Sequence, residues 1–376
     1  MIYWAVFTIM IISFYAWQIL GFSKMLNFQR TKFQADYLSA KASIVIAYRN
    51  ESENLDGLLN CLLSQTYEKE NWQIIMVDDF SEDDSFSKVE KFRLNHPELN
   101  IKNLKNDVAG KKSAITKAVK SADFNIIVST DADVTFKENW LWNNLQVFTK
   151  NSRTKLLTGP IKIKHDDSIF QIFQSLESMT LIGITAASIK ARKPILCNAA
   201  NMVFYKSDFI NLQPFKNNQN LASGDDIFLL KSIVKKYGNE AVDFNLSHNA
   251  LVTTFPKNSI KEMIQQRVRW ASKLKFTGQS FANLLGLIVF LTAFIIVVSF
   301  ILSPFNLQYL IIALLVFGVK MVIDIKFFDE LLPFFDEGDL YSKLTLIQLI
   351  YILYVLLLPF IALAGNFEWK DRNYKV

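Results

Sequence analysis

Apolar segments long enough to cross a membrane lie at both ends of the chain. Residues Ile2 to Phe22 carry no charge over about 21 positions, which is enough to span the core of a bilayer. Three more such segments lie near the C-terminus, at Asn283 to Leu302, Leu307 to Ile325 and Leu344 to Ala364. Buried core helices fit segments this long and apolar poorly, so the pattern predicts four transmembrane helices.

The residues between these segments alternate between short apolar runs and amphipathic stretches. Near-continuous apolar runs at 42–48, 72–77 and 124–130 are typical of strands buried in a parallel sheet. Residues 81–95 and 107–120 are predicted as helices, as is the stretch after the first run, where leucines recur at helical spacing. These leucines are Leu55, Leu58, Leu59 and Leu62. Strands that alternate with helices predict a doubly wound α/β sheet.

Composition and charge place this central part against a membrane. The chain is 51% hydrophobic, with a mean hydropathy of +0.19, a net charge of +6 and a pI near 9.0. In a chain with membrane spans, cytoplasmic positive charge and anionic lipid headgroups account for such an excess of basic residues. We therefore expect membrane lipids, and no nucleic acid, among the partners. Cys61 and Cys197 are the only cysteines, which is too few for a disulfide framework or a zinc cluster.

The basic residues also predict an orientation. Lys24, Arg30 and Lys32 directly follow the first span, so Met1 is expected outside and the following domain in the cytoplasm. Three further crossings would leave Val376 outside, although the tail after the last span is basic. The predicted location is a multi-pass protein of the plasma or inner membrane.

Carboxylates follow two of the predicted strands. Asp131 and Asp133 come after the run at 124–130, and Asp78 and Asp79 come after the run at 72–77. Open α/β sheets bind ligands at the carboxyl ends of their strands, so these acids predict a nucleotide site on one edge. Asp131 and Asp133 can both face one Mg²⁺ or Mn²⁺ ion that carries a diphosphate. The alternative for Asp78 and Asp79 is a turn that caps a helix.

Two later motifs carry further candidate chemistry. Asp225 and Asp226 precede an apolar helix, where a carboxylate can take a proton from an acceptor hydroxyl or simply cap the helix. Gln266, Arg269 and Trp270 lie in a basic segment with one apolar face, which predicts an amphipathic helix at the membrane surface. A plain membrane anchor explains the basic residues but does not require these three.

Lys111 and the segment from Ile169 to Ile189 each allow two interpretations. Lys111 can neutralise a diphosphate, or it can belong to a solvated face together with Lys112. The apolar segment carries polar residues at Gln171, Gln174 and Glu177, which a transmembrane helix would rarely tolerate. It is interpreted either as an ordinary core helix or as a helix beside the membrane that forms one wall of an acceptor site near Trp270.

Five motifs follow one another along the chain. They are Ser43-Ile44-Val45-Ile46-Ala47-Tyr48-Arg49-Asn50-Glu51, Asp78-Asp79-x-Ser81, Asp131-x-Asp133, Gly224-Asp225-Asp226 and Gln266-x-x-Arg269-Trp270. In this order they resemble the family 2 glycosyltransferases of the GT-A fold. The similarity is to the membrane-embedded branch, which includes cellulose, hyaluronan and poly-N-acetylglucosamine synthases and ceramide glucosyltransferase. One departure is Gly224-Asp225-Asp226, where many relatives have Thr-Glu-Asp; the second carboxylate is kept.

The resemblance implies a role for each motif. The nucleotide-sugar would contact Tyr48, Glu51, Asp78, Asp79, Lys111 and Asp131, and the metal would be held by Asp133 and Asp131. Asp226 would be the catalytic base. Gln266, Arg269 and Trp270 would close over the diphosphate and shape the mouth of the acceptor site.

The resemblance also implies a domain organisation around a GT-A catalytic domain with a Rossmann-like mixed sheet. The expected parts are a transmembrane helix at 1–22, the catalytic domain at 23–255, an amphipathic interfacial helix at 256–280, three transmembrane helices at 281–365 and a tail at 366–376. Four spans are fewer than pore-forming polymer synthases carry, which argues against coupled secretion.

The expected function is metal-dependent, inverting transfer of a hexose or N-acetylhexosamine. The donor would be a nucleotide-sugar, expected to be UDP-linked, and the acceptor would be a lipid or a glycan. Three alternatives remain. One is a processive polysaccharide synthase. The others are a nucleotidyl or phosphosugar transferase, and a non-catalytic membrane scaffold that binds a nucleotide.

Overall fold

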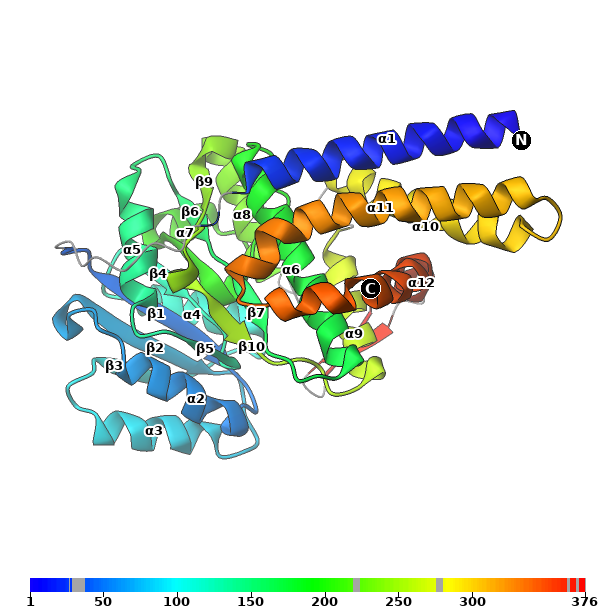
Figure 1. Cartoon of the computed structure of the whole chain (residues 1–376). Coiled ribbons are helices and arrows are strands. Elements are labelled where there is room, and N and C mark those ends of the chain that lie inside the picture. Colours follow the sequence, from blue (N-terminus) through cyan, green and yellow to red (C-terminus); the bar gives the residue numbers. More distant parts are fainter. Residues whose placement is uncertain are drawn as a thin grey trace.

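The computed structural model describes the chain except for residues 27, 29–37, 219–223, 275–279, 364–365, 370–371 and 376. A domain of strands and shorter helices carries a group of long helices that projects from one side (Figure 1). The helices are α1 Ile2–Met25, α2 Ser52–Leu63, α3 Ser85–Asn95, α4 Lys111–Lys120, α5 Trp140–Lys150, α6 Ile169–Lys190, α7 Lys206–Leu212, α8 Asp225–Tyr237, α9 Ile260–Leu274, α10 Ser280–Leu302, α11 Leu307–Phe334 and α12 Leu344–Leu363.

Two sheets form the centre of the domain. The larger has the strand order β3-β2-β1-β4-β8-β6-β9, and the smaller has the order β5-β10-β7. Strands β1 to β4 are parallel to one another, whereas β8 runs antiparallel to β4, so the larger sheet is mixed as expected. The strands are β1 Ala42–Tyr48, β2 Trp72–Asp78, β3 Ile101–Lys105, β4 Ile126–Ser129, β5 Val134–Phe136, β6 Leu156–Thr158, β7 Ile161–Ile163, β8 Met202–Tyr205, β9 Val242–Phe244 and β10 Val252–Thr254, with β11 Asn366–Trp369 and β12 Arg372–Lys375 pairing near the C-terminus.

The predicted strands are confirmed within one or two residues, but two predicted helices begin later than expected. α3 begins at Ser85 rather than residue 81, because Phe80 takes a left-handed φ of 62° and the chain turns before the helix. α4 begins at Lys111 rather than residue 107, since Gly110, with φ at 133°, ends a loop. Both loops lie at the edge of the sheet where the predicted acids lie.

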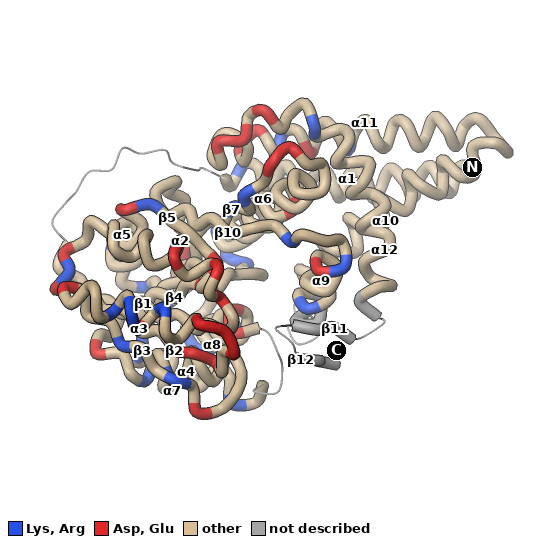
Figure 2. The backbone as a smooth tube through the Cα atoms, turned by 90° about the horizontal axis from the view of Figure 1, so that it is seen from below, with Lys and Arg blue, Asp and Glu red and all other residues tan. Residues whose placement is uncertain are grey.

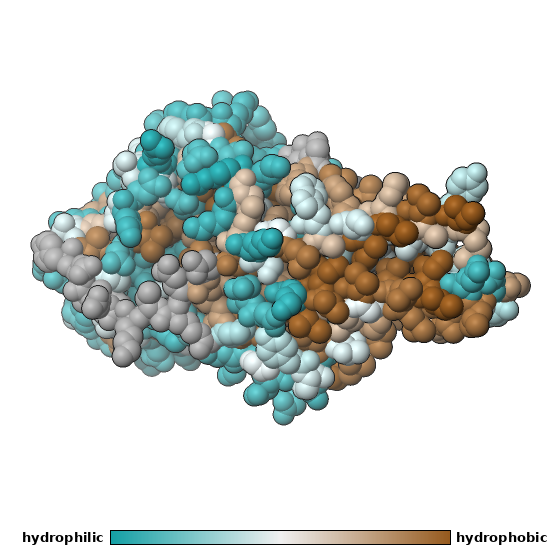
Figure 3. All heavy atoms as spheres, turned by 45° about the horizontal axis from the view of Figure 1, so that its top comes forward, coloured by the Kyte–Doolittle hydropathy of each residue, from teal (hydrophilic) through white to brown (hydrophobic). Residues whose placement is uncertain are grey.

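Four helices in the described part of the chain are long and apolar enough to cross a membrane. They are Ile2–Met25, Ile169–Lys190, Phe281–Leu302 and Gly338–Ile361. Apolar side chains cover the projecting helices, while hydrophilic ones cover most of the sheet domain (Figure 3). Lys, Arg, Asp and Glu likewise gather on the sheet domain (Figure 2).

Three of the four predicted spans coincide with these helices, and the fourth does not. The predicted span Leu307 to Ile325 lies in α11, which is outside the set; its 28 residues include charged side chains from Lys320 onward. Lys320 and Asp324 are buried and pair with each other, and Tyr15 of α1 donates a hydrogen bond to Asp324. α11 therefore packs along α1 through polar contacts as well as apolar ones.

The helix that completes the set, α6, is mostly buried inside the protein. The most apolar stretch of α6 is 83% buried, and Phe173 packs edge-on against Tyr354 of α12. α6 also contacts α9, the helix that carries Trp270, as the interpretation of α6 as one wall of an acceptor site requires. The polar side chains of Gln174 and Glu177 are used inside the protein, because they contact the backbone of Lys257 and the side chain of Arg267.

Close packing of α6 on α11 gives a first testable prediction. A Cβ atom at Gly183 would lie 2.7 Å from Cζ of Phe327 and 2.9 Å from Cδ2 of Leu331. Gly183→Val is expected to lower the free energy of unfolding by about 1–3 kcal/mol, since overpacked cores lose about that much. The measurement is the thermal unfolding midpoint in detergent.

Gly318→Val in α11 is the matched control, because a Cβ atom there meets nothing within 4 Å. Equal midpoints for the two variants would show that α6 does not pack on α11 in this way.

Candidate active site

The site forms where three parallel strands end side by side. Tyr48 at the end of β1 lies opposite Asp78 at the end of β2, and the backbone N–H of Asp79 donates to the carbonyl of Tyr48 over 2.8 Å. β4 pairs with the other side of β1 and leads into Asp131 and Asp133. The strand register therefore brings both predicted carboxylate pairs to the same edge of the sheet, as expected for open α/β sheets.

Asp79 organises the loop that precedes α4. Its Oδ1 accepts from the backbone N–H of Gly110 over 2.7 Å and from Nδ2 of Asn106 over 2.8 Å. A residue with a side chain rarely adopts the φ of 133° found at Gly110, so the loop depends on this glycine. By binding Gly110, the buried carboxylate of Asp79 also fixes the position of Lys111, the next residue after Gly110.

The other predicted nucleotide contacts lie around the same strand ends. The hydroxyl of Tyr48 donates to Oδ1 of Asn103 over 2.7 Å, and burial, chiefly, raises the pKa of this tyrosine. Oε2 of Glu51 accepts from Nδ2 of Asn54 over 2.7 Å. Asp78 accepts from the backbone N–H of Ser81 over 3.2 Å, which is the turn-forming role set out as the alternative for this pair.

Lys111 joins residues that are far apart in the sequence. Its Nζ lies 2.7 Å from Oδ1 of Asp131 and 3.4 Å from Oδ2 of Asp225. Burial by itself would lower the pKa of Lys111, but the carboxylates of Asp131 and Asp225 outweigh it and raise the pKa. The lysine is therefore a fixed positive charge inside the site and not part of a solvated face.

Arg269 of α9 supplies a second positive charge. Burial lowers its pKa, and four carboxylates oppose this effect by favouring the charged guanidinium. In order of their influence on Arg269 these are Asp225, Asp131, Asp226 and Asp133. The strand ends, the start of α8 and the amphipathic helix α9 therefore converge on one place.

Asp226 lies at the start of α8, where a carboxylate interacts favourably with the positive end of the helix dipole. Its Oδ1 accepts from the backbone N–H of Ile227 over 2.8 Å. The preceding Gly224 has a φ of 98°, and a Cβ atom there would lie 2.7 Å from Cε2 of Phe228. Both this φ and the closeness of Phe228 favour glycine at position 224.

The predicted helix is present as α9, Ile260–Leu274, which is shorter than the predicted range of 256–280. Its Gln266 and Trp270 make their described contacts with Arg267 on the same helix. The side chain of Gln266 accepts from Arg267, and the guanidinium of Arg267 lies 4.4 Å from the centre of the Trp270 ring. Gln266 and Trp270 are therefore linked through the residue between them in the motif.

The charge balance of the site suits a divalent cation. Four carboxylates face two basic side chains, and burial together with Asp133 and Asp225 raises the pKa of Asp131 against the opposing effect of Lys111. Among the described residues there is no group of three or more His, Cys, Asp or Glu side chains that could hold a metal by itself. Mg²⁺ commonly takes one or two protein carboxylates and completes its shell with phosphates and water. Asp131 and Asp133 fit that kind of site.

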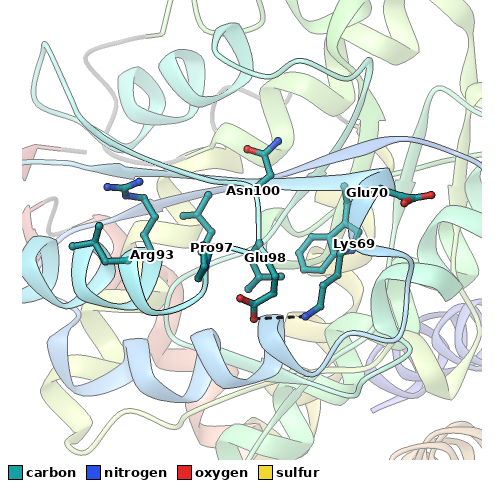
Figure 4. Close-up of a pocket in the computed structure, with 10 residues that line it drawn as sticks. Lys69, Glu70, Arg93, Pro97, Glu98 and Asn100 are labelled. Atoms are coloured by element: carbon teal, nitrogen blue, oxygen red, sulfur yellow. Dashed lines mark ion pairs between the residues drawn. The ribbon is translucent and has the colours of Figure 1, made fainter.

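A hollow of about 790 Å³ lies elsewhere on the domain (Figure 4). Its lining includes Trp72 and Ile101, the first residues of β2 and β3, with Lys69 and Glu98 paired across it at 3.7 Å. This is the amino-end edge of the parallel strands, opposite the edge that carries the carboxylates. The hollow is therefore separate from the candidate active site.

Sequence reasoning missed two residues that the structure places in the site. Asp225 was considered only as part of its motif, yet it contacts Lys111 and has the largest influence among the carboxylates on Arg269. Asn106 follows β3 and holds both Asp79 and the loop before α4. A polar residue directly after a third parallel strand is the signal that could have identified Asn106.

The family model "Glycosyl transferase family 2" matches residues 43–207. A poly-beta-1,6-N-acetyl-D-glucosamine synthase from Staphylococcus epidermidis is 26% identical over 231 residues, which cover 61% of this chain and 53% of that protein. The chain therefore spans about half the length of the curated relatives it matches.

One solved structure matches the fold over nearly the whole chain. The mannosyltransferase PcManGT from Pyrobaculum calidifontis, solved with GDP-Man and Mn²⁺, has a TM-score of 0.58 and 14% identity, and covers 96% of this chain and 95% of its own. TarS from S. aureus, residues 1–349 with UDP, covers 66% of this chain and 69% of its own at a TM-score of 0.41 and 18% identity.

Proposed function

Because this chain belongs to the family 2 glycosyltransferases, we propose that it moves a hexose or N-acetylhexosamine from a nucleotide-sugar to a hydroxyl group of a lipid or glycan, with inversion. The observation that carries this proposal is the convergence of Lys111 of α4 and Arg269 of α9 with two pairs of carboxylates, one that follows β4 and one that begins α8. Such a site can hold a diphosphate at one end and remove a proton at the other.

The chemistry needs one displacement step. Asp226 takes the proton of the acceptor hydroxyl, whose oxygen attacks the anomeric carbon from the side opposite the leaving group. The bond between that carbon and the diphosphate oxygen breaks, and the nucleoside diphosphate leaves with the electron pair. Lys111 and Arg269 stabilise the charge that develops on it, the kind of electrostatic effect that contributes most to many enzymatic rates.

Asp131 and Asp133 would hold a Mg²⁺ or Mn²⁺ ion, which supplies further positive charge for the diphosphate. Tyr48, Glu51, Asp78 and Asp79 would contact the nucleoside, and Gln266 and Trp270 would border the acceptor. These roles follow from the family resemblance and from the place of each residue around the strand ends.

We further propose that the projecting helices seat the enzyme in a plasma or inner membrane. The apolar surfaces of α1, α10 and α12 support this placement, with Met1 outside and the sheet domain in the cytoplasm. Reporter fusions at Met1 and at a sheet-domain loop test it: the two should report opposite sides, and signals from the same side would contradict the orientation.

The proposed function is tested with purified protein, a panel of nucleotide-sugars and membrane lipid and glycan extracts. UDP-N-acetylglucosamine is the first donor to try, given the name of the matched synthase. The expected products are a nucleoside diphosphate and a glycosylated acceptor, detected by mass spectrometry. Release of pyrophosphate would instead indicate a nucleotidyl transferase, and UDP binding without any transfer would indicate a scaffold.

Lys111→Met is expected to weaken the binding of UDP in the presence of Mg²⁺. A hydrogen bond to a charged group contributes about 1.5–3 kcal/mol, so the Kd should rise about tenfold to a hundredfold. Isothermal titration calorimetry measures it. Lys117→Met on the same helix is the control, because Lys117 pairs with Asp107, outside the site. Equal UDP affinities in the two variants would contradict the role of Lys111.

A further inference from the structure

A buried ion pair joins α9, which carries the Gln-x-x-Arg-Trp segment, to α6, and a hydrogen bond joins the pair to α12. Arg267 of α9 is 3% exposed and Glu177 of α6 is 9% exposed. Both Nε and Nη2 of Arg267 donate to Oε2 of Glu177, with the Nε contact at 2.8 Å. The other carboxylate oxygen, Oε1, accepts from the hydroxyl of Tyr354 of α12 over 2.6 Å. Each oxygen of Glu177 therefore has a strong donor from a different helix.

The guanidinium of Arg267 also contacts two side chains of the motif, Gln266 and Trp270. Nη1 of Arg267 donates to the side chain of Gln266, and its centre lies 4.4 Å from the ring of Trp270. A cation over an aromatic face and a hydrogen bond to an amide both constrain the rotamers of the groups they touch. Arg267 is thus held in place by Glu177 and in turn contacts the side chains of Gln266 and Trp270.

We propose that Glu177 and Tyr354 are positioning residues, which act through Arg267 to hold Gln266 and Trp270 in place for glycosyl transfer. The inference rests on the proposed function, in which Gln266 and Trp270 border the acceptor. It assigns a task to α12, a helix long and apolar enough to span a membrane. The position of α12 then affects the positions of Gln266 and Trp270 in the active site.

The burial of the pair distinguishes this arrangement from ordinary packing. Removing two charges from water is costly, and an apolar pair of similar volume is often as stable or more stable. Stability alone therefore gives no reason for an ion pair here. The planar guanidinium of Arg267 binds Glu177 with directional hydrogen bonds and contacts Gln266 and Trp270 at the same time. An apolar pair cannot reproduce these directional contacts.

The experiment compares a double variant with single ones in the full-length protein. Glu177→Leu combined with Arg267→Met replaces the pair with apolar side chains, and its thermal midpoint is expected near that of the wild type. Its kcat with UDP-N-acetylglucosamine and membrane lipid extract, or with whichever donor and acceptor the wild type uses, should stay at least about tenfold low, because Gln266 and Trp270 lose their support. The Kd for UDP should change less than in Lys111→Met, since Lys111 and Asp131 are untouched. Recovery of both midpoint and kcat would overturn the inference.

Tyr354→Phe provides a milder test that preserves the ring packed on Phe173. Loss of one hydrogen bond to Glu177 is expected to raise the acceptor KM or lower kcat about threefold to tenfold, with wild-type UDP affinity. Tyr351→Phe, one turn away on α12, is the matched control. Wild-type kinetics for Tyr354→Phe would overturn the inference even if the double variant does not fold.

A spectroscopic measurement separates this inference from the proposed function. The emission of Trp270 is isolated as the difference between each protein and its Trp270→Phe derivative. In the double variant this emission should shift to longer wavelength, because the unsupported ring becomes more exposed to water. An unchanged emission would overturn the positioning role. Absence of turnover by the wild type, with the shift present, would instead contradict the proposed function.

Discussion

Asp226→Asn is expected to retain UDP binding while transfer falls by about a hundredfold to ten-thousandfold, the usual contribution of a general base. The amide keeps the size of the side chain and its capacity to accept from the N–H of Ile227, so α8 should form normally. It cannot take a proton from the acceptor hydroxyl. The measurement is nucleoside diphosphate release in the presence of acceptor, alongside a UDP titration.

Two comparisons make this result specific. Asp123→Asn, an exposed residue that pairs with Lys102, should turn over like the wild type. Asp225→Asn should differ from Asp226→Asn by altering UDP affinity, because Asp225 contacts Lys111 in the site. If Asp226→Asn transfers sugar at the wild-type rate, the base is another residue.

Asp133→Ala is expected to lower activity by at least about a hundredfold, as is an excess of chelator added to the wild type. A metal ion contributes several kcal/mol of charge stabilisation to such reactions, and each 1.36 kcal/mol corresponds to a factor of ten in rate. The fold should persist, because the described hydrogen bond of Asp133 uses its backbone carbonyl, which accepts from Thr254 over 3.2 Å.

Mn²⁺ or Mg²⁺ titration of the chelated enzyme measures this requirement directly. Asp167→Ala, at an exposed position on the loop before α6, serves as the control and should need the same metal concentration as the wild type. Full turnover of the wild type in excess chelator would show that Lys111 and Arg269 alone neutralise the diphosphate.

The sequence predicted the sheet, and the edge at which the acids gather, because both depend on local patterns. Buried parallel strands such as Ala42–Tyr48 are near-continuous apolar runs, and the acids that follow them are adjacent in sequence. The edge on which Asp78, Asp79, Asp131 and Asp133 lie then follows from the rules of α/β topology. The predicted starts of α3 and α4 were less accurate, because positive φ angles at Phe80 and Gly110 keep the chain in a turn before each helix.

Contacts between distant parts of the chain were beyond such reasoning. Lys111 and Asp225 are 114 residues apart in the sequence. They pair because α4 and α8 begin at the same edge of the fold. The polar residues of α6 were recognised, but their partners were not. Glu177 is paired with Arg267 and Tyr354, so this part of the polar stripe lies in a buried interface between helices.

Anomeric configuration of the product tests the central claim most directly. Purified protein would be given an α-linked nucleotide-sugar and its acceptor, and the new glycosidic bond would be examined by NMR together with the released nucleotide. The account predicts a β-linked product and one nucleoside diphosphate for each sugar transferred, since a single in-line displacement inverts the anomeric carbon. An α-linked product, or pyrophosphate in place of the nucleoside diphosphate, would contradict it.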